Sequence, residues 1–309
     1  MNCPGGTEVM HIERMAPGVS VAARLPGGWF RNNTGWVTGS SGTVMVDTAA
    51  TEHLTRRLID QIGIDSAELR IVLTHAHGDH VNGAGLLARR GASVYAAEAA
   101  CADVRAGPHT FPSVFDAPDG MWGAIDPPER IEPVSERTMF DLGDRRVMVV
   151  PVPETAHTPG DLVVYDDVSG TLFAGDLVFS GVTPFALQGR ITGWLRALDW
   201  LDSFDAARVV PGHGPVPADA AVLTGMREYF HWLLEVTTEE TCDFGALTER
   251  ARQRWAGWHD QERHPVNLRV AYSENHGTDL DLAEGIGAML HAAGGPIRLD
   301  LNTAGDAAL

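Results

Sequence analysis

The segment Thr74–His80, which reads THAHGDH, constrains the fold of this chain more than any other part of the sequence. It directly follows the apolar run Leu69–Leu73, which predicts a buried strand. Three imidazoles and one carboxylate therefore stand at the C-terminal end of a strand, where open α/β sheets place their ligand sites. His75 and His77 alternate as strand-end side chains do and can face one point. Neutral imidazoles and carboxylates are ligands of zinc, so the segment predicts a metal site.

Four more acidic or histidine residues stand at the ends of predicted strands. Asp176 follows the apolar run Thr171–Ala174, and His213 follows the run Arg208–Val210. Asp47 ends a third strand, and His157 lies in a turn rich in Thr, Pro and Gly. A single His or Asp at such a place is more often structural. Their joint placement predicts that these groups converge on one edge of the sheets.

Strand and helix signals alternate along the first two thirds of the chain. β-branched runs predict an antiparallel meander over residues 19–47, followed by alternating helices and strands over 51–96. A Pro-rich irregular stretch covers 107–133, and a second β-rich stretch over 138–174 leads into a helix at 193–202 and a strand at 208–210. The order predicts a layered α/β fold.

Beyond Pro217 the pattern predicts helices over residues 220–234, 244–255 and 280–293, and a frayed tail after Ile297. We therefore expect a catalytic domain over residues 1–218 and a C-terminal helical region over 219–309.

Composition narrows the function classes. The chain has 23 Lys and Arg against 41 Asp and Glu, a net charge of −18, which argues against a nucleic-acid partner. Its 3 cysteines form no CxxC pair, which is typical of a reducing compartment. The N-terminal residues lack the pattern of a signal peptide, and no apolar run approaches the roughly 20 residues of a membrane span. We expect a cytoplasmic protein that binds no membrane.

The segments THAHGDH, HTPG at 157–160, GD at 175–176 and PGHG at 211–214 together resemble the metallo-β-lactamase-fold hydrolase superfamily, over about residues 17–217. The resemblance implies a four-layer αββα sandwich with a dinuclear site along its edge. It assigns three ligands to the first metal: His75, His77 and His157. It assigns three to the second: Asp79, His80 and His213. Asp176 would bridge the two metals, and Asp47 resembles the aspartate that supports the metal loop.

Such a site supplies both a nucleophile and a Lewis acid. Two cations about 3.5–4 Å apart deprotonate a shared water near neutral pH, and the resulting hydroxide attacks a carbonyl. We therefore expect two Zn²⁺ per chain, hydrolysis of a thioester-like acyl bond, and Asp79 and Asp176 as catalytic residues.

Differences between branches of the superfamily narrow the reaction. His77 departs from the flavodiiron pattern, which has Glu there, and Asp176 points away from true β-lactamases, which lack the bridging carboxylate. The ligand set matches the thioesterase, lactonase and glyoxalase II side. A persulfide dioxygenase with one iron is the alternative, because imidazole and carboxylate suit both metals. The presence of His80 and His213 favours the dinuclear hydrolase, and the filled ligand positions disfavour a binding module without activity.

Aromatic residues from two segments suggest the substrate. Trp29 and Phe30 lie in a hairpin that overhangs the metal site in related folds, and Phe179 and Phe185 lie in the loop after Asp176. An apolar cleft of this kind suits a bulky acyl substrate. Trp29 and Phe30 could equally pack on a neighbouring loop.

These features and the segment 267–272 also resemble the cyclase/thioesterases of bacterial aromatic polyketide pathways, which implies a small-molecule or carrier-protein-bound acyl substrate. Three arginine pairs are candidate docking sites for an acidic carrier, or simply solvated faces: Arg56–Arg57, Arg89–Arg90 and Arg145–Arg146. The sequence predicts no oligomeric state.

Overall fold

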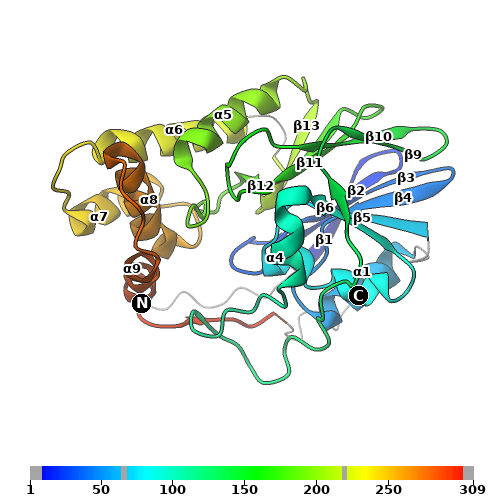
Figure 1. Cartoon of the computed structure of the whole chain (residues 1–309), viewed down its shortest axis with the longest axis horizontal. Helices are drawn as coiled ribbons and strands as arrows, with labels where there is room; N and C mark the ends of the chain where they lie inside the picture. Colours follow the sequence, from blue (N-terminus) through cyan, green and yellow to red (C-terminus); the bar gives the residue numbers. More distant parts are fainter. Residues whose placement is uncertain (1–8, 64–67, 218–220, 302–309) are drawn as a thin grey trace.

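The computed structural model describes residues 9–63, 68–217 and 221–301. Cys3, Ala220 and the expected domain boundary near 218 lie outside the described residues, so the division into two domains stays a prediction. Two β-sheets face each other, with helices on their outer sides and a group of helices at one end (Figure 1). No helix among the described residues is both long and apolar enough to cross a membrane.

The first sheet contains seven strands within the described residues, in the order β1-β2-β3-β4-β5-β6-β8. Their bounds are β1 Val9–Ala16, β2 Val19–Leu25, β3 Thr34–Gly39, β4 Gly42–Val46, β5 Leu69–Leu73, β6 Ser93–Ala97 and β8 Glu132–Val134. The strands β2, β3 and β4 form the expected antiparallel meander, β1 adds a further antiparallel strand at its edge, and β5, β6 and β8 continue the sheet in parallel. The edge strand β1 was not predicted, because His11, Glu13 and Arg14 interrupt its apolar pattern.

The second sheet has five strands in the described part of the chain, in the order β13-β12-β11-β10-β9. Their bounds are β9 Thr138–Asp141, β10 Arg146–Pro151, β11 Leu162–Asp166, β12 Thr171–Phe179 and β13 Arg208–His213. The strands β12 and β13 extend past their predicted ends at Ala174 and Val210. Gly175 and Pro211 read as strand breakers, but their pairing only shifts the register of the two parallel strands. Asp176 and His213 therefore lie within strands rather than after them.

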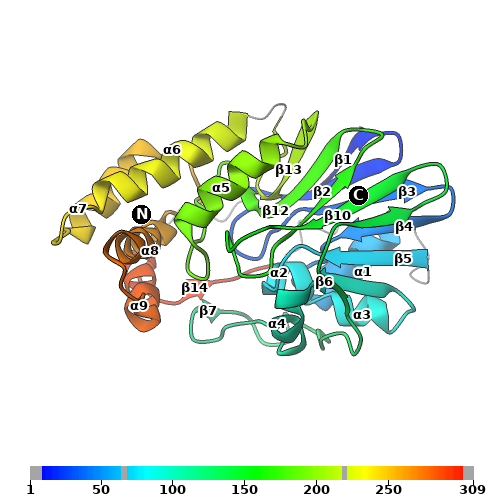
Figure 2. The same ribbon diagram turned by 45° about the horizontal axis from the view of Figure 1, so that its top comes forward.

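Three hydrophobic clusters build the layers. Side chains such as Val21, Val44, Val149 and Val164 fill the space between the two sheets. The outer face of the first sheet packs on α1 Glu52–Ile62, α3 Ala84–Ala88 and α4 Cys101–Arg105. The outer face of the second sheet packs on α5 Ile191–Asp202 and α6 Ala221–Val236. The layers confirm the predicted αββα sandwich, seen along its edge in Figure 2.

Local signals explain the helices. The Thr51 side chain accepts a hydrogen bond from Leu54 N and caps α1, and Gly63 ends this helix in the left-handed conformation. Within the alternating helices and strands expected over 51–96, the apolar pattern at 82–90 predicts one helix, whereas the structure has two short helices, α2 Gly78–Val81 and α3, which meet at Asn82 and Gly83.

Between residues 221 and 301 the structure has four α-helices: α6, α7 Phe244–Arg254, α8 His264–His276 and α9 Leu282–Ala293 (Figure 1). The sequence did not predict α8, because its apolar residues do not recur with a period of 3.6. In the structure its first eight residues are nearly all buried, so no polar face marks the helix. Trp194 of α5, Phe230 of α6 and Leu268 of α8 share one hydrophobic cluster. The C-terminal helices therefore extend the packing around the second sheet.

The expected fraying after Ile297 is wrong for the residues up to 301. Leu299 is 2% exposed and Leu301 is 0% exposed. Strand β14 Ile297–Arg298 pairs in parallel with β7 Phe115–Asp116, which lies within the stretch expected to be irregular. This pairing anchors the tail because it lets the two leucines pack beside Phe30 and Phe115.

Candidate metal centre

The structure brings the seven predicted metal ligands together at one edge of the sandwich. His75 and His77 follow β5, Asp79 and His80 lie on α2, and His157 lies between β10 and β11. The remaining two, Asp176 and His213, come from β12 and β13. Their ligand atoms form two groups in which all the atoms lie within 4.8 Å of one another: His75, His77, His157 and Asp176, and Asp79, His80 and His213.

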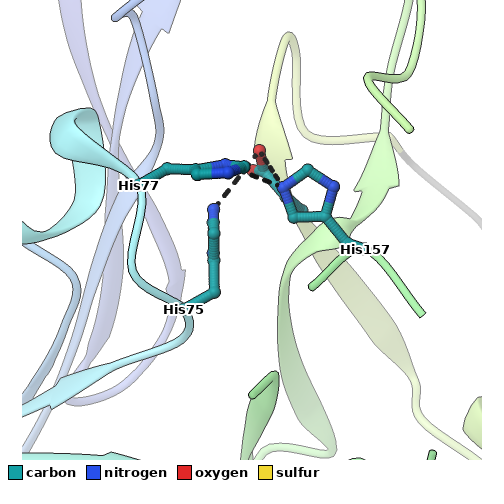
Figure 3. Close-up of side chains that lie close together, drawn as sticks. His75, His77 and His157 are labelled. Carbon is teal, nitrogen blue, oxygen red and sulfur yellow. Dashed lines mark hydrogen bonds and ion pairs between the residues drawn. The ribbon is translucent and has the colours of Figure 1, made fainter. Parts of the chain in front are cut away.

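The first group is built by three imidazoles that point at one another (Figure 3). His157 Nε2 lies 3.0 Å from His77 Nδ1. Asp176 Oδ2 lies 3.4 Å from His157 Nε2 and 3.7 Å from His75 Nε2. The three rings meet nearly at right angles, so that their nitrogens converge on one point.

The second group lies on the other side of Asp176. His213 Nε2 is 3.1 Å from Asp79 Oδ2, and His80 Nε2 is 3.8 Å from the same oxygen. Asp176 Oδ1 lies 3.2 Å from His80 Nε2, and its Oδ2 lies 3.5 Å from His213 Nε2. Asp176 therefore contacts both groups.

Hydrogen bonds behind the rings fix which nitrogen faces the centre. Asp47 accepts hydrogen bonds from Thr74 N at 2.7 Å, Thr74 Oγ1 at 2.8 Å and His80 Nδ1 at 2.8 Å. His213 Nδ1 donates to the Gly27 carbonyl at 2.8 Å. These contacts leave Nε2 of His80 and His213 directed inward, as expected for metal ligands.

His77 is oriented by a residue that sequence reasoning missed. Its Nε2 lies 2.5 Å from Gln188 Oε1, which leaves Nδ1 for the first group. Gln188 is 111 positions away along the chain and belongs to no motif, so nothing in the sequence connects the two side chains.

The pKa values of the four buried histidines at this centre shift in opposite directions. Burial lowers the pKa of His75 and His157 well below the ordinary value, so both rings are neutral. Burial also opposes the charge of His80 and His213, but Asp176 and neighbouring carboxylates outweigh it. They raise the pKa of His80 well above its usual range and that of His213 to about 9.

The carboxylates respond in the opposite sense. Burial favours the neutral form of Asp79, but His80 and His213 lower its pKa to about 2. The same histidines, with His75, hold the pKa of Asp176 well below its usual range against burial. Both carboxylates are ionised and compensate positive charge at this centre.

Unsatisfied atoms test whether a metal fits. Nε2 of His75, Nε2 of His80 and Oδ1 of Asp176 are buried and make no hydrogen bond of normal geometry among the described residues, although the last two atoms lie 3.2 Å apart. A buried polar atom without a hydrogen bond costs about 1–3 kcal/mol, and a cation bound between these atoms would remove that cost. Imidazoles and carboxylates at this spacing are suitable ligands for divalent metals such as zinc.

A cavity of about 260 Å³ opens beside the metal centre. The four predicted substrate residues, Trp29, Phe30, Phe179 and Phe185, all contribute to its wall. Sequence reasoning missed the other contributors from the irregular stretch and from the C-terminal region: Phe111, Val114, Phe115, Arg263, Leu282, Ile286 and Met289. The metal end of the cavity is polar, and most of the remaining wall is apolar.

The aromatic side chains form a connected wall. Trp29 contacts Phe115 and Phe185 edge to face, with ring centroids 5.1 and 5.0 Å apart. Phe179 stacks on His213 with centroids 5.3 Å apart, so the wall reaches the second group of ligands. Trp29 therefore lines the cavity and also packs on neighbouring segments, and its contact with substrate stays a prediction.

Comparisons with known proteins agree with this geometry. The family model of the metallo-beta-lactamase superfamily matches residues 27–213, more than half of the chain. No curated protein matches the chain.

Solved structures match over most of their own length. The metallo-beta-lactamase from Pontibacter korlensis has a TM-score of 0.59 and 20% identity, and the match covers 72% of this chain and 99% of that one. A metallo-beta-lactamase family protein from Thermus thermophilus has a TM-score of 0.62 and 20% identity, over 85% of this chain and 95% of that one. The metallo-beta-lactamase from Hirschia baltica has a TM-score of 0.55 and 19% identity, over 72% and 97%. At these identities the likeness to solved structures shows a common fold and nothing about the reaction.

Proposed function

The chain belongs to the metallo-beta-lactamase superfamily, and on that premise we propose that it is a dinuclear zinc hydrolase of thioester-like acyl bonds. His75, His77 and His157 would hold one zinc ion, and Asp79, His80 and His213 the other. Asp176 would bridge them.

The position of Asp176 is the observation that carries this proposal. Its two oxygens lie between 3.2 and 3.7 Å from four imidazole nitrogens that belong to both groups. A carboxylate that served one metal alone would have no reason to contact the histidines of the other group. A bridging role also explains why its Oδ1 is buried without a hydrogen bond.

The protein residues prepare the site for its ions. A pair of zinc ions supplies Lewis acidity and lowers the pKa of a water that they share toward neutrality. Asp47 keeps the His80 ring in the orientation that presents Nε2, and the Gly27 carbonyl does the same for His213. Because these contacts fix the orientation of both rings, they preorganise the ligands for the ions.

The cavity supports an acyl substrate with an apolar body. Its aromatic wall excludes water from one side of the metal centre, and the carbonyl to be cleaved would lie at the polar end. This arrangement is also suited to ring closure of an aromatic polyketide, so cyclisation belongs to the same proposal as a second outcome of substrate binding.

The arginine pairs give little support to a carrier protein as the substrate donor. Arg145 is largely buried, because it contacts Asp166 and donates to the Pro17 carbonyl. Arg56 pairs with Glu52 and Arg89 with Asp126. A small-molecule thioester is therefore the substrate that we propose first.

The test is hydrolysis of the 2-naphthoyl thioester of N-acetylcysteamine by the zinc-loaded chain. Release of the thiol should depend on zinc, stop after chelation and return when zinc is added back. Asp176→Ala should abolish it and lower the bound zinc. Consumption of dioxygen and a persulfide by an iron-loaded chain, without thioester cleavage, would instead favour the dioxygenase alternative.

A further inference from the structure

The C-terminal region supplies one wall of the cavity beside the metal centre. The family match ends at residue 213, yet Leu282, Ile286 and Met289 of α9 all line this cavity. Their spacing of four and three residues places them on one face of the helix. Opposite them lies the aromatic wall that includes Trp29 and Phe185.

The rim of the cavity is also apolar. Phe111 is 45% exposed and Leu282 is 54% exposed, and they are two of the few large hydrophobic side chains that are exposed within the described residues. They come from the irregular stretch and from α9, two segments far apart in sequence, and both line this cavity. Exposed apolar side chains that gather at one opening mark a binding site rather than chance exposure.

The helix wall is fixed in place by packing. Met289 is buried in a cluster with Phe30, Phe115, Leu299 and Leu301. The pairing of Ile297 with Phe115 ties the end of α9 to the segment that carries Phe111. The cavity therefore has a preformed width, which is set by α9 on one side.

Arg263 is the one arginine among the described residues that line the cavity, and its charge is already engaged by the protein. The guanidinium of Arg263 lies 3.8 Å over the Trp29 ring and 2.7 Å from Asp260, and it donates to the Thr183 carbonyl. These contacts hold Trp29 in the wall and offset the charge of the arginine. An apolar ligand body thus meets mainly ring faces and aliphatic side chains.

We propose that the face of α9 formed by Leu282, Ile286 and Met289 selects the acyl group. Rings of about bicyclic size would pack between this face and the aromatic wall, because 260 Å³ is just below the ~300–1,000 Å³ of pockets that bury drug-sized ligands. Small acyl groups leave the space unfilled and gain nothing from it. The proposal rests on the proposed hydrolase function for its substrate, but not for the existence of the apolar site.

The experiment narrows the cavity with Ile286→Trp in the full, zinc-loaded chain. His291→Trp is the matched control, because it adds the same side chain at an exposed position of the same helix outside the cavity. We expect kcat/KM for the 2-naphthoyl thioester to fall by at least about tenfold in Ile286→Trp, whereas the acetyl thioester changes less than about threefold. The control and the zinc content should match the unmodified chain.

Equal losses for the two thioesters, or no loss in Ile286→Trp, would overturn the proposal. If the Trp variant does not fold, Ile286→Ala takes its place, and the loss of contact should again weaken only the naphthoyl substrate.

A binding measurement separates this proposal from the hydrolase function. If no thioester is cleaved, the hydrolase function fails, and fluorescence of the neutral probe N-phenyl-1-naphthylamine still tests the site. Binding by the unmodified chain and by His291→Trp, weakened about tenfold in Ile286→Trp, supports the apolar site. Equal binding by all three proteins overturns it.

Discussion

Asp47→Asn tests whether the carboxylate behind the metal centre organises it. Asp47 has a positive φ of 63°, a conformation that Asn also tolerates, so the backbone should keep its shape. The carboxylate uses both oxygens, Oδ1 for Thr74 N and Oδ2 for Thr74 Oγ1 and His80 Nδ1. An amide has one oxygen, so in either orientation a buried donor of Thr74 or His80 faces an NH₂ group.

The expected changes in stability and in zinc affinity both follow from that lost acceptor. One buried donor without a partner should lower the free energy of unfolding of the metal-free protein by about 1–3 kcal/mol. Loss of the support behind a ligand typically weakens metal binding by about 10–100-fold. Because Asp47 contacts His80 and not His157, the loss should fall on the second zinc, the ion bound by Asp79, His80 and His213.

The assay is a zinc titration against a chromophoric chelator, together with urea unfolding of the metal-free chain. Asp166→Asn is the matched control, because Asp166 is also fully buried but lies at the far end of β11, where it contacts Arg145. We expect the control to lose stability and to keep both zinc affinities. Unchanged binding of the second zinc in Asp47→Asn, or equal losses in both variants, would refute the reasoning.

Three further predictions concern Gly35, Arg263 and His213. Gly35→Ala should destabilise the fold by about 1–3 kcal/mol in thermal unfolding without changing zinc stoichiometry, because a Cβ would lie 2.1 Å from the Phe173 ring. Arg263→Met should cost about 3–5 kcal/mol in urea unfolding, since it leaves the Asp260 carboxylate without its cation, and Asp260→Asn in the same chain should recover part of the loss. The pKa of His213 is raised from 6.5 to about 9, so its contribution to metal-free stability is full below pH 6.5 and is lost as the pH rises through about 9. Zinc must displace that proton, so calorimetry in buffers of different ionisation enthalpy should detect proton release on zinc binding at pH 7, and zinc binding without proton release would contradict this.

The candidate metal ligands could be found from the sequence because their motifs resemble those of a known superfamily and because most of them follow an apolar run. Apolar runs mark the strands, and the carboxyl ends of neighbouring parallel strands meet at one edge of a sheet. His75 follows a strand of the first sheet and His213 ends a strand of the second, so their meeting at one centre also depends on how the two sheets pack. The ends of β12 and β13 were misjudged at Gly175 and Pro211, but this error moved neither Asp176 nor His213 away from the site.

The cavity could be predicted only in part. Phe185 follows the Asp176 motif closely and Trp29 was placed by the resemblance, whereas Ile286 lies on a helix whose partners depend on how the C-terminal region packs. The helix α8, which carries much of that packing, has apolar residues on all sides and gives no periodic signal. Gln188 and the pairing of Ile297 with Phe115 are long-range contacts without a motif.

The central claim is that two metal ions bind to the two groups of ligands joined by Asp176. Its most direct test is inductively coupled plasma mass spectrometry of the full chain, purified without added metal, beside the Asp176→Ala variant. The two groups of ligands predict about two zinc ions per chain, and loss of the bridge should lower that content. One iron per chain, or zinc content unaffected by the loss of Asp176, would contradict the account.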